Sequence, residues 1–129
     1  MNQAADEIRA LLQTYFDAWY ECDVDKLKAV FHPSCHLVCV IDGALDDDDM
    51  AKVYGRIARL ESGANRGDAR HDRVLMVDVA SATTAVAKVR LAIGSKLFTD
   101  YLSLLHLDGR WMIMAKVFSF RPLGEGEAA

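Results

Sequence analysis

Apolar residues recur at helical spacing in the first half of the chain. Between residues 3 and 21 they are three or four positions apart, which places them on one face of a helix. A short helix from Val24 to Phe31 is predicted next, with Asp23 as its N-cap and Pro33 beyond its end. The same spacing predicts a third helix from Met50 to Leu60. The apolar positions of the first helix are Ile8, Leu11, Leu12, Tyr15, Phe16 and Trp19.

Between the second and third helices, residues 35–41 are rich in β-forming side chains and end at Asp42-Gly43, which predicts a strand. Four acids, Asp46 to Asp49, then precede the third helix. They lack the ligand alternation and glycine turn of a calcium loop. Because negative charge near a helix N-terminus complements the helix dipole, we expect these acids to cap the helix.

The last third of the chain reads as an antiparallel meander. Four β-rich runs span residues 73–80, 83–93, 96–107 and 110–120, and Gly94-Ser95 and Asp108-Gly109 separate the last three. Asp-Gly between such runs is a strong signal for a tight hairpin. Helices followed by antiparallel strands predict an α+β fold, as a single domain over residues 1–121 with a flexible tail at 122–129.

A polar segment, residues 61–72, joins the third predicted helix to the meander. It contains two glycines and shows no periodicity, so we expect a loop. Loops of this kind often border a binding site, and this one is a candidate for the rim or lid of a pocket.

The two turns of the meander fix which side chains share a face of the sheet. Two-residue turns put Asp100 opposite Val89 on one neighbouring strand and opposite Val117 on the other. Asp100 then lies among apolar side chains on the face that packs under the helices. This register assumes no bulge, since one extra residue would swap the two faces.

The opposite face is also apolar, and a soluble monomer rarely leaves such a face open. We therefore expect a homodimer through this face, with Lys88, Tyr101 and Lys116 covering the partner sheet with their long side chains. The apolar residues of this expected interface are Leu105, Met112, Met114 and Phe118.

Composition narrows the functional classes. The chain has 129 residues and a net charge of −4, with no basic patch to bind nucleic acid. It has neither the apolar run of about 20 residues that a membrane span needs nor a signal-peptide pattern. Three cysteines and four histidines lack zinc-site spacing, and no nucleotide-binding motif is present. We expect a cytoplasmic protein with reduced thiols, no metal and no cofactor.

Four short motifs follow one another along the chain: Phe31-His32-Pro33, Asp100-Tyr101-Leu102-Ser103-Leu104, Asp108-Gly109-Arg110-Trp111 and Lys116-Val117-Phe118. In this order the chain resembles the nuclear transport factor 2-like superfamily, a cystatin-like α+β fold, and within it the lumazine-binding-like and polyketide-cyclase-like group. The resemblance implies a bent antiparallel sheet wrapped around three N-terminal helices, with a cone-shaped cavity. The superfamily includes isomerases, dehydratases, cyclases, adaptors and binders, so the resemblance implies fold more than function.

Asp100 is the candidate catalytic residue, and the alternative is a structural acid bonded to a backbone amide, to Tyr15 or to a helix end. An unpaired carboxylate among apolar groups is poorly solvated, which raises its pKa toward the range useful for acid–base chemistry. The resemblance implies that such a carboxylate takes a proton next to a carbonyl. Some polyketide-cyclase-like relatives carry a histidine two residues before a serine on the last strand. Here that position is Val117, before Ser119, which leaves Asp100 without an obvious partner on that strand.

Three functions stay open from the sequence. The favoured hypothesis is a protein that binds a largely apolar, cyclic or carbonyl-bearing small molecule. The second is a cofactor-free isomerase, dehydratase or cyclase with Asp100 as general base, and the third is a structural or adaptor dimer with a filled cavity. The residues expected to contact a ligand are Tyr15, Trp19, Tyr54, Asp100 and Trp111.

Overall fold

A computed structural model describes residues 3–124, which form one six-stranded sheet and four helices. The strand order is β2-β1-β6-β5-β4-β3, in which β1 and β6 pair in parallel and the other neighbours are antiparallel. The elements are α1 (Gln3–Glu21), α2 (Val24–Val30), β1 (His36–Ile41), β2 (Ala44–Asp49), α3 (Met50–Ile57), α4 (Gly63–Arg66), β3 (Arg73–Val79), β4 (Thr84–Ile93), β5 (Lys96–Leu107) and β6 (Arg110–Pro122).

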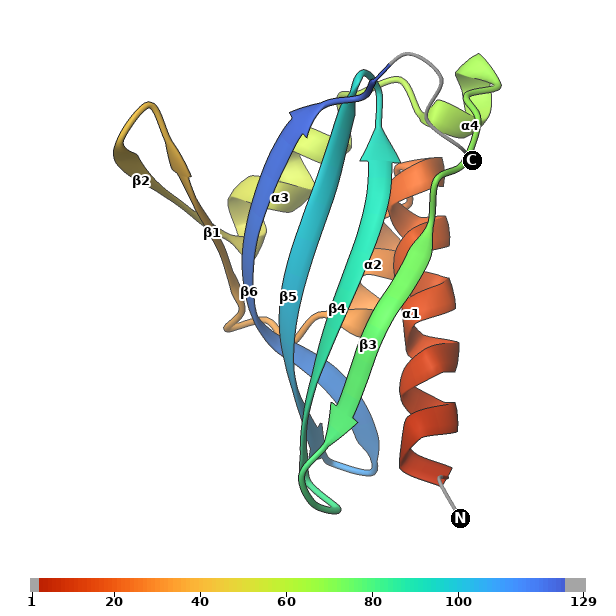
Figure 1. The fold of residues 1–129 in the computed structure, drawn as a ribbon, viewed down its shortest axis with the longest axis vertical. Helices are drawn as coiled ribbons and strands as arrows, with labels where there is room; N and C mark the ends of the chain where they lie inside the picture. Colours follow the sequence, from red (N-terminus) through yellow and green to blue (C-terminus); the bar gives the residue numbers. More distant parts are fainter. Residues whose placement is uncertain (1–2, 125–129) are drawn as a thin grey trace.

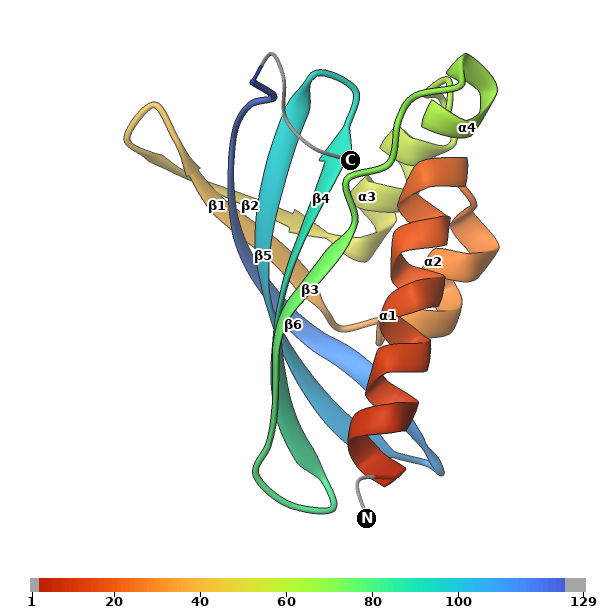
Figure 2. The ribbon, with the colours of Figure 1, turned by 45° about the vertical axis from the view of Figure 1, so that its right-hand side comes forward.

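The sheet bends around the helices, which all lie on one side of it (Figures 1 and 2). Figure 2 shows α1 running along β3, with α2 behind it, while α3 and α4 lie toward the end of the sheet that carries the β4–β5 turn. The β1–β2 hairpin projects away from the long strands (Figure 1). The α+β architecture with a bent sheet around N-terminal helices is therefore confirmed.

The predicted apolar face of α1 forms the centre of the core. Ile8, Leu12 and Tyr15 have no exposed surface, and they pack in one cluster with Val89 and Leu102 of the sheet. Asp23 also caps α2 as predicted, because its side chain accepts a hydrogen bond of 3.1 Å from the backbone amide of Lys26.

The acidic run has a different role from the one expected. Asp46, Asp47 and Asp48 lie on β2, which pairs with β1 through a turn at Asp42-Gly43, and only Asp49 caps α3. The expectation that all four acids cap the helix is wrong. Both turn residues have positive φ, 50° and 79°, and this tight hairpin turn pairs the strands despite the low β-propensity of aspartate.

The two hairpin turns of the meander form where predicted. Asp108 and Gly109 both have positive φ, 52° and 83°, as a tight hairpin requires, and Leu107 pairs with Arg110. Across the other turn, Val89 pairs with Asp100 as expected. The structure thus confirms that Asp100 lies on the core face of the sheet.

A bulge in β6 corrects the predicted register between β5 and β6. Leu104 pairs with Ile113 but Ser103 pairs with Ala115, so Met114 is an extra residue in the ladder. Beyond it Asp100 pairs with Phe118, not with Val117. Lys116 and Phe118 therefore lie on the core face, and their expected place on the outer face is wrong. Val117 points outward and is 56% exposed.

At the C-terminal end, the sheet extends further than the sequence predicted. Pro122 still belongs to β6, and the backbone amide of Leu123 donates to the carbonyl of Ser95 at 2.8 Å. The rest of the predicted tail, residues 125–129, lies outside the described residues. Within the described part of the chain, none of the helices has the length and apolar character needed to span a bilayer.

Candidate functional site

Asp100 lies in the core with two partners. Its side chain has no exposed surface. The Tyr15 hydroxyl donates to Oδ2 at 2.5 Å, and Nζ of Lys116 lies 3.3 Å from the same oxygen. The expected lack of a partner on the last strand is therefore wrong, because the bulge in β6 brings Lys116 to Asp100. Charge-assisted contacts of this kind are among the stronger polar interactions in proteins.

The ammonium group of Lys116 is surrounded by aromatic rings. Nζ lies 4.6 Å from the ring centroid of Trp19, 4.8 Å from that of Phe118 and 5.5 Å from that of Tyr15. Each ring face attracts a cation. Because Lys116 is only 4% exposed, these rings and Asp100 replace most of the water around its charge. The expectation that Lys116 belongs to an outer interface is wrong.

Burial sets the proton affinities of this cluster. It lowers the pKa of Lys116 from its ordinary value, and the Asp100 carboxylate offsets part of that change. Burial and the charge of Asp100 both raise the pKa of Tyr15, so its hydroxyl keeps its proton and donates it to Asp100. Burial also raises the pKa of the neighbouring Cys35 to about 11, so this thiol is protonated near neutral pH.

Two buried polar atoms of the cluster have no hydrogen-bond partner among the described residues. They are Oδ1 of Asp100 and Nε1 of Trp19. Buried polar groups are normally paired, and an exception often marks a place where another molecule binds. The first atom accepts hydrogen bonds and the second donates one.

A cavity of about 370 Å³ opens next to this cluster, and Lys116 forms part of its wall. Small-molecule pockets usually measure about 300–1,000 Å³. Neither Tyr15 nor Asp100 lines the cavity, so a molecule inside it meets Lys116 first, with Asp100 behind. The lining also includes Arg56 and Lys96 and the apolar side chains of Trp19, Leu37, Ile57, Leu60, Phe98 and Phe118.

A second hollow of about 220 Å³ adjoins the first, and Trp19, Ile57 and Leu60 line both. Its outer wall comes from the segment 61–72, in which Gly63–Arg66 form the short helix α4, capped by Ser62, where only a loop was expected. The polar segment thus lies at the border of a pocket, in keeping with its sequence.

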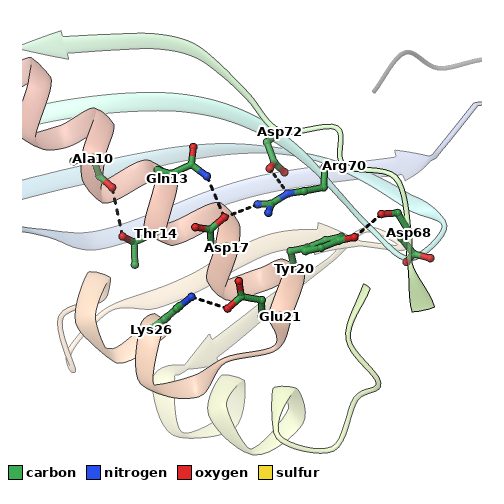
Figure 3. Close-up of polar contacts among 10 residues, drawn as sticks. All are labelled: Ala10, Gln13, Thr14, Asp17, Tyr20, Glu21, Lys26, Asp68, Arg70 and Asp72. Atoms are coloured by element: carbon green, nitrogen blue, oxygen red, sulfur yellow. Dashed lines mark hydrogen bonds and ion pairs between the residues drawn. The ribbon is translucent and has the colours of Figure 1, made fainter. Parts of the chain in front are cut away.

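The border segment is fixed to α1 by a small polar network (Figure 3). The Tyr20 hydroxyl donates to the backbone carbonyl of Asp68 at 2.6 Å. Arg70 contacts both Asp17 and Asp72 at 2.8 Å, and its guanidinium lies 4.5 Å from the ring centroid of Tyr20. These contacts hold the segment beside the second hollow.

The structure brings together three of the five predicted ligand-contact residues, Tyr15, Trp19 and Asp100. Tyr54 is half-buried on α3 with Nζ of Lys28 at 5.4 Å from its ring, and it does not line the cavity. Trp111 packs against His106 at the other end of β6, with ring centroids 5.3 Å apart, and it also lies outside the cavity.

Lys116 is the site residue that sequence reasoning missed. Its place on the core face follows from the bulge at Met114, whereas regular alternation along β6 predicted a place on the outer face. A regular ladder would bury Ala115 and Val117, which are apolar, and expose a lysine, so the hydrophobic pattern favoured the wrong face. Among the described residues, no group of three potential metal ligands is present either.

Comparison with known proteins agrees with this architecture. A model of the family described as putative lumazine-binding matches residues 3–119. A protein named aldolase FrzH, from Cladobotryum sp, is 24% identical over 119 residues, which cover 91% of each chain.

Solved structures show the same fold. An NTF2-like protein of unknown function from Shewanella baltica has a TM-score of 0.82 and 20% identity, covering 93% of this chain and 95% of that one. A ketosteroid isomerase-like protein from Erwinia carotovora atroseptica has a TM-score of 0.73 and 15% identity, covering 93% and 98%. The expected nuclear transport factor 2-like fold is confirmed.

Replacing Asp100 tests the buried pair. We expect Asp100→Asn to lower the free energy of unfolding by about 3–5 kcal/mol, because it leaves the Lys116 charge buried without its partner. Adding Lys116→Met should recover most of the loss. Urea denaturation measures both, and Glu21→Gln is the matched control, since its ion pair with Lys26 is exposed and contributes little to stability. A loss in Asp100→Asn no larger than in the control would contradict the assignment.

The lowered pKa of Lys116 predicts a pH dependence of stability. Between that pKa and the ordinary value of 10.5, the unfolded chain binds more protons at this site than the folded one. Stability then rises with pH in this interval. We expect the wild-type free energy of unfolding, minus that of Lys116→Met, to increase as the pH approaches 10.5. Urea titrations at several alkaline pH values measure this difference, and a constant or falling difference would be the contrary result.

Proposed function

The chain belongs to the putative lumazine-binding family, and from that premise we propose that it binds a small, largely apolar molecule through a carbonyl group. The observation that carries the proposal is the buried Lys116, which contributes one polar donor to the wall of an otherwise largely apolar cavity of about 370 Å³. Such a pocket, with few polar groups, suits a compact molecule with one acceptor.

The charge balance of the cluster favours a neutral ligand. Lys116 and Asp100 already form a neutral pair in the core. A carboxylate ligand would find Lys116 already paired with Asp100 and Arg56 already paired with Asp48, which leaves Lys96 as the remaining cation on the cavity wall. A carbonyl oxygen accepts a hydrogen bond from the ammonium without changing the net charge.

Enzymatic activity on such a molecule is the second candidate function. The unpaired Oδ1 of Asp100 favours a general base that takes a proton next to the carbonyl, as in an isomerase, dehydratase or cyclase. The name of the aldolase relative supports carbonyl chemistry in the same way. Against Asp100 as the direct base stands its position behind Lys116, outside the cavity lining. The open volume also weighs against a purely structural dimer with a filled cavity.

Binding of a matched pair of probes tests the proposal. We expect 1-indanone to bind at least about tenfold more tightly than indane, which has a similar shape and no oxygen, because a hydrogen bond to a charged group contributes about 1.5–3 kcal/mol. Titration calorimetry and thermal shift measure both. The preference should disappear in Asp100→Asn combined with Lys116→Met, which keeps the cavity and removes the charges. Equal binding of the two probes by the wild-type chain would overturn the proposal.

We also propose that two copies pair through the outer face of the sheet, centred on Met114 and Leu105. The support is an outer hollow of about 440 Å³ that both residues line, next to the exposed side chains of Tyr101 and Val117. Met112 and Phe118, named from the sequence, are not part of this surface, since Met112 is 6% exposed and Phe118 lies on the core face.

The oligomeric state tests this pairing. We expect light scattering after size exclusion to give the dimer mass for the wild-type chain and the monomer mass for Met114→Glu, because a buried unpaired carboxylate disrupts an apolar interface. Leu45→Glu is the control, since Leu45 is 71% exposed on β2, on the projecting hairpin. A monomeric wild-type chain, or a dimeric Met114→Glu variant, would contradict the proposed interface.

A further inference from the structure

We propose that Lys116 is a nucleophile that forms a covalent imine with the carbonyl carbon of an aldehyde or ketone bound in the cavity. This inference rests on the proposed function and deepens it, because it assigns the ligand a reactive group and the protein a chemical step.

The position of the amine is the first support. Lys116 is the one buried lysine among the described residues, and unlike Asp100 and Tyr15 it reaches the cavity wall. Trp19 and Phe118, whose rings lie within 5 Å of Nζ, line the same cavity. When the oxygen of a carbonyl group accepts a hydrogen bond from Nζ, the carbonyl carbon bonded to it therefore lies next to the nitrogen.

The cluster also contains the acid–base partner that the reaction needs. Imine formation requires a neutral amine, and burial lowers the pKa of Lys116 toward that state. Asp100, with Oδ2 at 3.3 Å from Nζ, is placed to take the proton. Tyr15 donates to the same oxygen and keeps its own proton, so it positions the carboxylate. Cys35, as a protonated thiol, does not compete as a nucleophile.

The step balances in atoms and charge. Asp100 takes one proton from the ammonium, the nitrogen lone pair attacks the carbonyl carbon, and the π electrons move to the oxygen, which becomes a hydroxyl of the carbinolamine by taking the second ammonium proton. Asp100 then returns its proton to the nitrogen, which passes a proton to that hydroxyl; water leaves, and the nitrogen lone pair forms the C=N bond. The sum is ammonium plus carbonyl giving protonated imine plus water, with Asp100 unchanged.

The surroundings suit the product as well as the starting group. The protonated imine has one positive charge at the former position of the ammonium, beside the Asp100 carboxylate and the faces of Trp19 and Phe118. No new charge is buried during the reaction. The same cation–π contacts that surround the ammonium therefore stabilise the imine.

Reductive trapping tests the inference. Wild-type protein is incubated with 1-indanone or benzaldehyde and sodium cyanoborohydride, which reduces an imine to a stable secondary amine, and the modified residue is located by peptide mass mapping. We expect Lys116 to be modified faster than the exposed lysines, and indane, which fills the cavity and forms no imine, to protect Lys116 more than any lysine outside the cavity lining. Lys116→Arg keeps the positive charge and should lose the adduct, whereas Lys88→Met, on the outer face, should keep it.

The outcomes separate the two proposals. If 1-indanone binds more tightly than indane and neither carbonyl probe modifies Lys116, the covalent step is wrong and the binding function stands. If 1-indanone shows no preference over indane, the proposed function fails. Modification spread evenly over the exposed lysines, with Lys116 no faster, also overturns the covalent step, because the buried cluster then confers no reactivity.

Discussion

The contact between Lys116 and Asp100 is the constraint on which the interior of this protein depends. Each charge loses several kcal/mol of solvation on burial, and a mutual contact offsets that loss only with good geometry and further polar contacts. Here the further contacts are the Tyr15 hydroxyl and the aromatic faces around Nζ. A well-packed apolar pair of similar volume would often be at least as stable. The pair is therefore better explained by chemistry at the cavity than by stability.

The bulge at Met114 makes that contact possible. Without an extra residue, a strand that starts at the Asp108-Gly109 turn would put Val117 opposite Asp100 and turn Lys116 outward. With the bulge, Lys116 pairs with Leu102 and its side chain reaches Asp100 on the core face. The single extra residue in β6 thus decides whether the side chain of Val117 or that of Lys116 lies on the core face near Asp100. Bulges near functional sites commonly redirect a side chain in this way.

Most of the fold followed from the sequence because local signals there agree with the tertiary structure. Three local features could be predicted from the sequence: the apolar face of α1, the Asp23 cap and the positive-φ turn at Asp108-Gly109. The register beyond Met114 was not, since a bulge has no signature in alternation when both faces are apolar. The burial of Asp100 could therefore be predicted, but its partner Lys116 could not. In the same way, pairing with β1 placed most of the Asp46 to Asp49 run on a strand despite its composition.

The fold shared with the solved structures leaves the chemistry to individual residues. The two structures compared above are 15–20% identical to this chain, so the comparison with them shows the fold alone. In this chain the chemistry that we propose depends on Lys116, whose desolvation is a cost to stability and, at the same time, the source of its nucleophilicity. The bent sheet keeps water away from Nζ, and Asp100 keeps the proton within reach. An exposed lysine has neither property, because solvent raises its pKa and no fixed base lies beside it.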